Sequence, residues 1–440
     1  MAVKVCKFGG TSMADGNVMN RVKSIIESDK DRKYVVVSAP GKRYSGDIKI
    51  TDILYECHKE VAEKGSCGAA FQLIRSRFNS IVRELNIDFD IDSVLDETEM
   101  RINTEKDVDF TASRGEYLSA RVMAEVLGAK FIDADDVIFF DENGLYDAEK
   151  SDKAIREALR GADKAVFPGF YGKGFNGKVK TFSRGGSDIS GAIVARAVNA
   201  TVYENWTDVS GFLACDPRIV DSPKRIKMLS YKELRELSYM GANVLHSESI
   251  FPVRKANIPI HIKNTFRPED DGTLIQPSVY YTPSGNTVTG IAGKKDFTVI
   301  FIEKSLMNSQ IGFVRKVLSV LEQYDIPVEH IPSGIDTMSV VIESAALKNG
   351  KLELVLKGIK DAVAPDTLRV LEDIALIATV GHGMSSSVGT SARLFKAMAA
   401  AEINVKMIDQ GSSELNIIVG VNNSDCDNCI RAIYREFFGN

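Results

Sequence analysis

The segment Lys7–Ser12 (KFGGTS) combines a lysine, two glycines and two hydroxyl side chains directly after an apolar stretch. Adjacent glycines allow main-chain N–H groups to face an anion at close range. Lys7 adds a positive charge beside them, which suits a triphosphate, whose transfer needs positioning and charge neutralisation. A Gly-Gly turn near a lysine also occurs in many proteins that bind no phosphate, so this segment alone leaves both interpretations open.

A second glycine-rich segment, Ser183–Asp188 (SRGGSD), opens an alanine-rich helical pattern that runs to Asn199. Free N–H groups at a helix start attract negative charge. Arg184 can hold a carboxylate or a phosphate through two parallel hydrogen bonds. Asp188 has two interpretations. It is either a first-turn acid that complements the helix dipole, or a carboxylate that orients Lys7 or a metal-bound phosphate.

A third segment, Trp206–Gly211 (WTDVSG), follows a predicted strand and is itself followed by a DPR motif. Ligands of parallel sheets bind beyond the carboxyl ends of the strands. Thr207, Asp208 and Arg218 are therefore candidates to hold ribose or phosphates. The alternative is a polar turn with a helix N-cap.

Two other segments have the composition of functional motifs. Ser113–Glu116 (SRGE) lies in a helical pattern, where Glu116 either pairs with a substrate ammonium group or lies on the helix surface. Gly172–Lys178 has the spacing of a P-loop, but Val179 replaces the required Ser or Thr and no helical pattern follows. We interpret this segment as a flexible lid or turn.

The first 290 residues alternate apolar, β-branched stretches with helical patterns, which predicts an α/β fold with a mainly parallel sheet. Strands are predicted at Val3–Phe8, Tyr34–Ala39, Phe131–Asp133, Lys164–Phe167, Thr201–Trp206 and Ile258–Ile262. The clearest helices are predicted at Thr51–Glu63, Ala69–Leu85, Asp109–Leu127 and Ser187–Asn199.

After a turn cluster near residue 283, the sequence repeats itself at an offset of 77 residues. Apolar residues and glycines coincide at Met307 and Met384, Gly312 and Gly389, Leu321 and Met398, Ile326 and Ile403, Val328 and Val405, Ile331 and Ile408, and Gly334 and Gly411. The repeat indicates either two generic βαβ units or a duplicated α/β module that pairs with its copy.

Composition narrows the class of protein. The chain has 440 residues and a net charge of −5, which indicates two to four domains and argues against a nucleic-acid partner. No stretch approaches the roughly 20 apolar residues of a membrane span, and the N-terminus lacks the pattern of a secretory signal. Six cysteines predict a reducing, cytoplasmic location, with Cys426 and Cys429 expected to be inert thiols near a helix start.

These motifs together resemble the aspartokinase branch of the amino-acid kinase family over nearly the whole chain. The segments that carry the resemblance are Lys7–Ser12, Val37–Ala39 (VSA), Ser113–Glu116, Arg184–Asp188, Trp206–Gly211 and Asp216–Arg218, together with the C-terminal duplication. The resemblance implies a three-layer α/β sandwich over residues 1–290. Two βαββαβ ACT modules would follow in 291–440, module one at about 303–370 and module two at about 371–440 plus the strand near 296–302.

The resemblance also implies roles for individual residues. Lys7 would neutralise charge on the transferring phosphoryl group and Asp188 would orient Lys7. The aspartate substrate would contact Ser38, Thr51, Glu116, Arg184 and Ser187. ATP would contact Gly9, Gly10, Thr11, Gly186, Thr207, Asp208, Arg218 and Asn243. Mg²⁺ would bridge the ATP phosphates and be held mainly by phosphate and water, without a set of protein ligands.

The implied activity is phosphorylation of the β-carboxylate of L-aspartate by ATP, the first step towards lysine, threonine and methionine. An amino-acid effector, expected to be lysine, would bind the ACT modules, and the chain would form a homodimer or homotetramer through them. The effector residues would be Met307, Asn308, Gln310, Ile311, Gly312, Val328 and Glu329. Kinases with another acceptor (glutamate, carbamate or a nucleotide) and a sensor without turnover are the alternatives.

The sequence departs from the family pattern at four places. Leu213 stands where a tyrosine is common in the family. Asn243 stands where many members of the family have the lysine of a GAKVLHP segment. Ser183 stands where glycine is usual, and the loop Lys42–Lys49 is changed beside the expected acceptor pocket. Asn243 cannot supply the lysine's charge, so phosphate affinity is expected to be weaker or met elsewhere.

Overall fold

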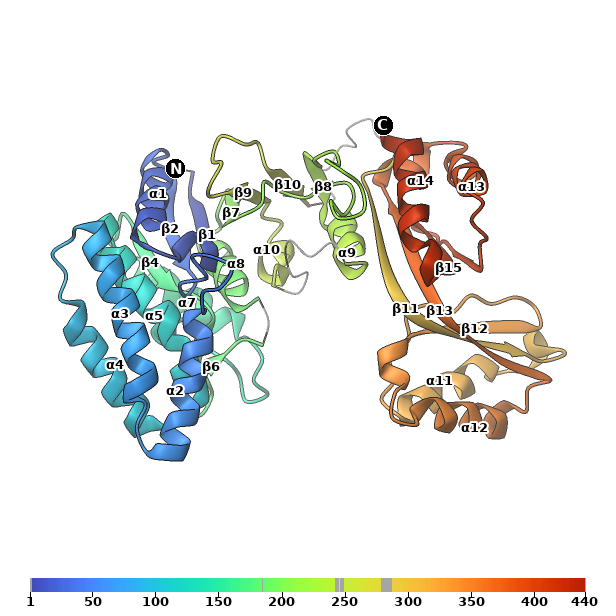
Figure 1. Cartoon of the computed structure of the whole chain (residues 1–440), viewed down its shortest axis with the longest axis horizontal. Coiled ribbons are helices and arrows are strands. Elements are labelled where there is room, and N and C mark those ends of the chain that lie inside the picture. The colour runs from blue at the N-terminus through green and yellow to red at the C-terminus, as the bar shows by residue number, and fades with distance from the viewer. Residues whose placement is uncertain (1, 184, 242–244, 246–248, 278–286, 440) are drawn as a thin grey trace. The chain divides into compact units, whose positions relative to one another are not determined.

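The computed structural model describes residues 2–183, 185–241, 245, 249–277 and 287–439. The chain forms two compact units (Figure 1). Unit one comprises residues 1–212, 227–231 and 243–281, and unit two comprises 213–226, 232–242 and 282–440. The segments 213–226 and 232–242 belong to unit two, although both precede the predicted boundary near residue 290 in the chain.

Unit one is built on an eight-stranded sheet in which β9 and β10 form the antiparallel pair and the other pairs are parallel. The order across the sheet is β3 (Lys130–Phe131), β4 (Ala165–Pro168), β2 (Arg32–Val37), β1 (Lys4–Phe8), β7 (Val202–Thr207), β9 (Ile260–Asn264), β10 (Thr273–Gln276) and β8 (Met228–Ser230). The prediction of a mainly parallel α/β sheet is confirmed. All six predicted strands are present with shifted ends, whereas β8 and β10 were not predicted.

Helices cover both faces of this sheet (Figure 1). One face packs against α1 (Gly16–Glu27), α2 (Ile50–Lys64), α3 (Gly68–Leu85), α4 (Ile91–Glu105) and α5 (Val108–Leu127). The other face contacts α8 (Gly186–Ala197), which packs against α7 (Ala148–Ala158) and α10 (Phe251–Lys255). The one-turn helix α6 is Ala134–Val137. The four predicted helices are present, whereas α4 and α7 were missed.

Strand alternation decides which side chains of β1 reach which layer, because successive side chains point to opposite faces. Cys6 and Phe8 belong to the apolar core shared with α1–α5. Lys7, between them, therefore points to the α8 side. The P-loop-like segment forms the turn of a hairpin between β5 (Tyr171–Lys173) and β6 (Val179–Thr181), which supports the interpretation as a turn.

Unit two contains a five-stranded antiparallel sheet in the order β12 (Thr337–Glu343), β11 (Gly290–Glu303), β13 (Thr367–Val380), β15 (Asn416–Asn422) and β14 (Met407–Asp409). Its longer helices are α9 (Tyr231–Tyr239), α11 (Phe313–Gln323), α12 (Lys351–Val363), α13 (Thr390–Ala400) and α14 (Cys426–Phe438). Cys426 and Cys429 are buried at the start of α14, and burial raises the pKa of Cys426 to about 11 and that of Cys429 to about 12.

The predicted repeat appears in the structure as matching elements. β11 and β13, and likewise α11 and α13, begin and end 77 residues apart. Gly312 and Gly389 cap the two helices with φ of 80° and 88°, a conformation that glycine adopts at little cost. One detail differs from the prediction: Phe297–Glu303 pair with β12 of the first module, and Gly290–Lys294 lie opposite the half of β13 that pairs with β15.

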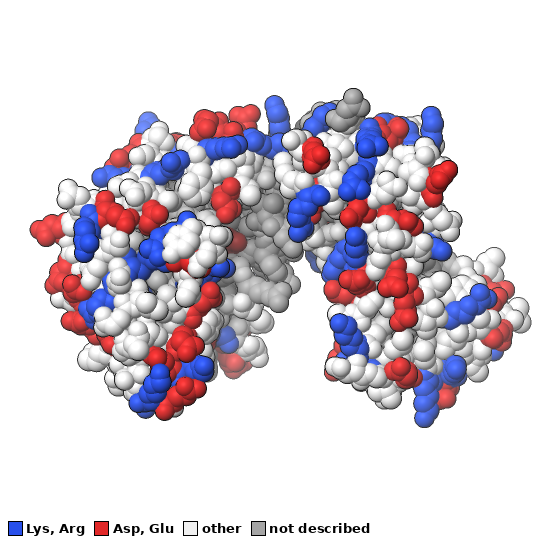
Figure 2. Space-filling model, in the orientation of Figure 1, with Lys and Arg blue, Asp and Glu red and all other residues white. Residues whose placement is uncertain are grey.

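Two surface properties bear on the class of protein. On the face drawn in Figure 2, lysines and arginines are interspersed with aspartates and glutamates over each unit. Among the residues described above, no helix has the length and apolar character needed to cross a bilayer.

Candidate active site

Lys7 and Asp188 form the centre of the candidate site. The Lys7 ammonium lies 2.6 Å from Oδ1 of Asp188, and the two side chains are 9% and 17% exposed. Asp188 lies in the first turn of α8, whose N-cap Gly185 has φ of 60°. That left-handed conformation favours glycine and lets the helix begin directly after the turn. Asp188 is therefore both an acid in the first turn of α8 and the ion-pair partner of Lys7.

The Gly9-Gly10 turn lies where β1 meets its two neighbouring strands. Gly9 donates its N–H to the carbonyl of Trp206 on β7 (3.0 Å), and Gly41, in the loop after β2, donates to the carbonyl of Gly10 (2.8 Å). A Cβ on Gly10 would lie 3.2 Å from the carbonyl oxygen of Ala39. A side chain at position 10 would therefore be tightly packed against Ala39, and the turn lies at the carboxyl ends of β1, β2 and β7. Thr11 follows in a 3-10 turn, Gly10–Met13.

Glu116 lies on α5, behind this turn, and is buried. Its Oε1 accepts a long hydrogen bond from Ser187 (3.5 Å), while its Oε2 is buried and has no hydrogen-bond partner among the residues that the structure describes. Burial raises the pKa of Glu116 to about 7, opposed by a main-chain hydrogen bond from Ala39 and by the charge of Lys7. A buried carboxylate oxygen without a partner is costly unless a cation or donor meets it.

Two further predicted aspartate contacts, Ser38 and Thr51, lie on either side of the loop that follows β2. Ser38 directly follows β2 and donates its N–H to the carbonyl of Phe8 (3.1 Å). Thr51 lies in the first turn of α2, and both residues are half-buried. A Cβ on Gly115 would lie 2.7 Å from Cβ of Ala39, so α5 packs tightly against the segment after β2. Arg184 lies outside the described residues.

The loop between Ser38 and Thr51 is held by a buried ion pair that was not predicted. Arg77, on α3, lies 2.7 Å from Asp47, and the two side chains are 6% and 7% exposed. Arg77 also donates to the carbonyls of Gly41 and Ala14 (both 3.3 Å). Asp47 accepts two further bonds from the side chain of Arg43. These contacts keep the Asp47 pKa below its usual 3.8, so the altered loop is rigidly anchored.

Replacing Arg77 with methionine is expected to destabilise unit one by about 3 kcal/mol, because Asp47 would lose a buried partner. Since the pKa of Asp47 is depressed, the wild-type pair stabilises fully above about pH 4 and less as pH falls below that value. Trp206, the single tryptophan, is buried in this unit, so its fluorescence during urea unfolding measures the change. Arg83→Met, at an exposed position on the same helix, is the control. Equal stabilities of the two variants would contradict the role of the pair.

Thr207 and Asp208, which were predicted to contact the nucleotide, lie at the end of β7 beside the end of β9. Thr207 ends β7, and its carbonyl accepts the N–H of Thr265 (2.8 Å). Asn264 donates to the Asp208 carbonyl (3.3 Å) and to Ser210 Oγ (2.9 Å). Thr265 Oγ1 lies 2.7 Å from the Ser12 hydroxyl. Asn264 and Thr265 were not among the residues predicted for the site. Their position as polar residues shortly after the predicted strand Ile258–Ile262 was the signal that could have identified them.

Arg218 and Asn243 are two further predicted nucleotide contacts. Arg218 belongs to unit two, where its guanidinium lies 2.6 Å from Asp216 and its side chain is 86% exposed. Leu213 also belongs to unit two and forms a bridge with Arg225. Asn243 lies outside the described residues.

The predicted effector residues lie in the first module of unit two. Met307 is buried, and Val328 packs against the same apolar cluster. Asn308, Gln310 and Ile311 are exposed, and Gly312 caps α11. Glu329 pairs with β12 through its N–H to Val341 (2.9 Å), and its carboxylate accepts a hydrogen bond from Tyr239 on α9.

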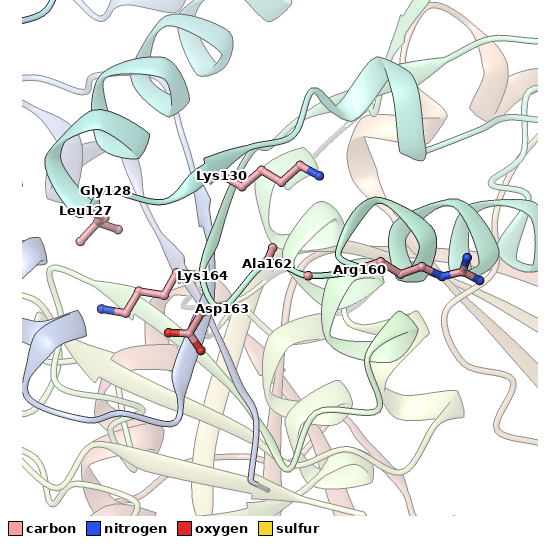
Figure 3. Close-up of a pocket in the computed structure, with 8 residues that line it drawn as sticks. Leu127, Gly128, Lys130, Arg160, Ala162, Asp163 and Lys164 are labelled. Carbon is pink, nitrogen blue, oxygen red and sulfur yellow. The ribbon is translucent and has the colours of Figure 1, made fainter.

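A cavity of about 460 Å³, lined by Leu127, Gly128, Lys130 and residues 160–164, is drawn in Figure 3. It lies at the amino ends of β3 and β4, the opposite end of the strands from the Gly9-Gly10 turn. Lys130 donates there to the carbonyl of Ala158 at the end of α7 (2.9 Å). This basic cavity is therefore separate from the candidate site, and Lys130 caps the end of α7 there.

The chain matches known proteins over nearly its whole length. A family model described as the amino acid kinase family matches residues 2–264, and an ACT domain model matches residues 377–437. This chain belongs to the amino acid kinase family.

The similar proteins narrow the class further. The aspartate kinase of Clostridium acetobutylicum is 51% identical, with a TM-score of 0.91 and 99% of each chain covered. Aspartokinase 3 of Bacillus subtilis strain 168 is 37% identical over 99% of each chain. E. coli aspartokinase III, in a complex with lysine and aspartate, is 25% identical with a TM-score of 0.71 over 99% of each chain. Within the family the chain is an aspartokinase, an ATP-dependent aspartate kinase.

Proposed function

We propose that this chain transfers the γ-phosphoryl group of ATP to the β-carboxylate of L-aspartate and so forms 4-phospho-L-aspartate. The contact between Lys7 and Asp188 beside the Gly9-Gly10 turn carries this proposal. This contact provides a cation beside a glycine turn at one edge of the sheet, and phosphoryl transfer depends on positioning and charge neutralisation of this kind.

The acceptor needs no general base, because the β-carboxylate of aspartate is already ionised at pH 7. Catalysis then consists of aligning two anions and reducing their repulsion. Lys7 would neutralise charge on the transferring phosphoryl group while Asp188 orients it. Glu116, with its unpartnered Oε2, would receive the α-ammonium group, and Arg184 would hold the α-carboxylate.

Mg²⁺ fits this site as an ion carried by ATP. The part of the chain that the structure describes contains no group of three or more His, Cys, Asp or Glu side chains that could hold a metal. Mg²⁺ commonly keeps several waters and takes only one or two carboxylates in addition to substrate phosphates. It would neutralise part of the charge of the ATP phosphates, and Asp188 and Asp208 are the carboxylates that could hold it.

The effector proposed for unit two is L-lysine, on the strength of the E. coli aspartokinase III complex that contains lysine and aspartate. Assembly as a homodimer or homotetramer through the ACT modules is supported by two apolar side chains at equivalent positions. Ile311 and Val388 each precede the capping glycine of their module and are fully exposed. Exposed apolar side chains that recur in this way favour an interface between copies of the chain.

Helix α9 offers a route from the effector region towards the nucleotide segment that follows it in the chain. Glu233, near its start, accepts from Thr289 Oγ1 (2.6 Å) and from the His382 N–H (2.9 Å). Tyr239, at its end, donates to Glu329 of the first module. An effector that repositions Glu329 would therefore act on the end of α9, four residues before Asn243.

Tyr239→Phe is expected to raise the lysine concentration needed for half-inhibition several-fold and to leave the uninhibited rate unchanged, because only the hydroxyl contact to Glu329 is removed. Inhibition curves for this variant and for Tyr324→Phe, at the end of α11, test the expectation. A half-inhibitory concentration equal to that of the control would exclude the contact from the regulatory route.

The proposed activity is tested by incubating the protein with ATP, Mg²⁺ and L-aspartate and trapping the acyl phosphate with hydroxylamine. Turnover that lysine suppresses supports both the reaction and the effector. Turnover that threonine suppresses and lysine does not would identify threonine as the effector in place of lysine. A folded protein that binds ATP without phosphorylating aspartate would contradict the proposal and favour another acceptor or a sensor.

A further inference from the structure

The carboxylate of Asp188 has a second partner besides Lys7. The side-chain amide of Asn205, on β7, donates to Oδ1 of Asp188 at 2.9 Å. This is the oxygen that also lies 2.6 Å from the Lys7 ammonium. Asn205 is 4% exposed, so water does not compete freely for this contact.

The sheet register brings these groups together. β1 and β7 are parallel neighbours, and Lys7 pairs with Asn205 across them. Directly paired residues project to the same face of a sheet, here the face covered by α8. The alternate residues Glu204 and Trp206 point to the other face, where Glu204 binds the Trp206 indole N–H (2.9 Å). A polar side chain at position 205 is therefore aimed at Asp188 by strand alternation alone.

The main chain of Asp188 is anchored independently of Asn205. The hydroxyl of Tyr203, two residues earlier on the same face of β7, donates to the Asp188 carbonyl (3.1 Å). The start of α8 is thus fixed against β7, and the Asn205 amide acts on the side chain alone. Without that amide, Asp188 would keep its backbone position but lose the neutral donor that restrains its carboxylate.

Lys7 and Asn205, the two donors to Asp188, would have different roles during catalysis. Under the proposed function, Lys7 must turn part of its charge towards the transferring phosphoryl group, which weakens its hold on Asp188. The Asn205 amide has no net charge, so the phosphoryl group attracts it much less than it attracts the Lys7 ammonium. We propose that Asn205 is a positioning residue, which holds the Asp188 carboxylate in place while the Lys7 ammonium engages the phosphoryl group. This inference rests on the proposed function.

The loss of this donor is expected to appear in kcat. Asn205→Leu, similar in size but without a donor, should lower kcat about 10- to 100-fold, the range expected for a hydrogen bond to a charged group. KM for ATP and for aspartate should change less than about threefold, since Asn205 contacts neither substrate in the proposed site. Asn205→Asp should lower kcat further, because it places a second carboxylate against Asp188.

A serine substitution separates positioning from packing. Asn205→Ser leaves a larger cavity than leucine, so it should be the less stable variant. It keeps a hydroxyl that can reach Asp188 through one water, so it should have the higher kcat. The opposite order of kcat and thermal stability is the expected signature. If the variant with the lower thermal stability also has the lower kcat, Asn205 has only a structural role.

These variants are measured in the full-length protein with the hydroxamate assay, beside Lys7→Ala and a control, Ile193→Val, at a fully buried position of α8. The control should lose some thermal stability without losing kcat. A loss of activity in Lys7→Ala together with normal kcat in Asn205→Leu would overturn the positioning role alone. Normal activity in Lys7→Ala would overturn the proposed catalytic pair itself.

Discussion

Lys7→Ala is expected to reduce kcat for aspartate phosphorylation by at least about a thousandfold. Removing the ammonium takes away the lysine charge that the proposed function assigns to the transferring phosphoryl group, in surroundings where charge is poorly screened. Binding of ATP and aspartate should weaken much less, because other groups of the proposed site would still contact them. Steady-state kinetics with the hydroxamate assay separate kcat from KM.

The variant is expected to remain folded. Asp188 is 17% exposed and keeps the Asn205 amide as a donor, so its carboxylate does not become an isolated buried charge. Lys4→Ala is the matched control, because Lys4 lies on the same strand and pairs with Asp29 at the surface (2.7 Å). Comparable kcat losses in both variants would point to damage to β1 and against a catalytic role for Lys7.

Glu116→Gln is expected to raise KM for aspartate about 100-fold with a smaller effect on kcat. The buried carboxylate would otherwise meet the substrate ammonium in an ion pair, and an amide cannot replace that charge. Glu125→Gln, at an exposed position of the same helix, is the control. An unchanged KM in Glu116→Gln would remove Glu116 from the aspartate pocket.

The pH dependence gives a second measurement on the same residue. The pKa of Glu116 is about 7 in the ligand-free protein, and a bound ammonium favours the ionised form. KM for aspartate should therefore fall as pH rises from about 6 to 8 in the wild type and stay level in Glu116→Gln. A level wild-type profile would mean that Glu116 does not ionise on binding.

Stability should change in the opposite direction from substrate affinity. Because burial raises the pKa of Glu116 above its usual 4.5, the folded protein loses stability from this group as pH rises from 4.5 to about 7. The loss then remains constant, at up to about 3 kcal/mol. Glu116→Gln should accordingly be more stable than the wild type at pH 8, with little difference near pH 4. Urea unfolding followed by Trp206 fluorescence measures both.

Local patterns in the sequence were sufficient to predict the α/β architecture, the repeat and the residue types of the candidate site. Glycine pairs, a lysine after a strand and an acid at a helix start are recognisable because their conformational and charge preferences act over a few residues. Period-2 and helical periodicities placed all six predicted strands and all four predicted helices. The offset of 77 residues reappears in the bounds of β11 and β13.

Contacts between residues that are far apart in the chain could not be predicted from these local patterns. Lys7 meets Asn205 only because β1 lies beside β7 in the sheet, nearly two hundred residues later in the chain. Arg77 meets Asp47 only because α3 packs against the loop after β2. The segments 213–226 and 232–242 join unit two through tertiary packing. The sequence by itself determined which groups are available for chemistry, and the tertiary structure decided which of them share a face, because side-chain contacts depend on packing between distant elements.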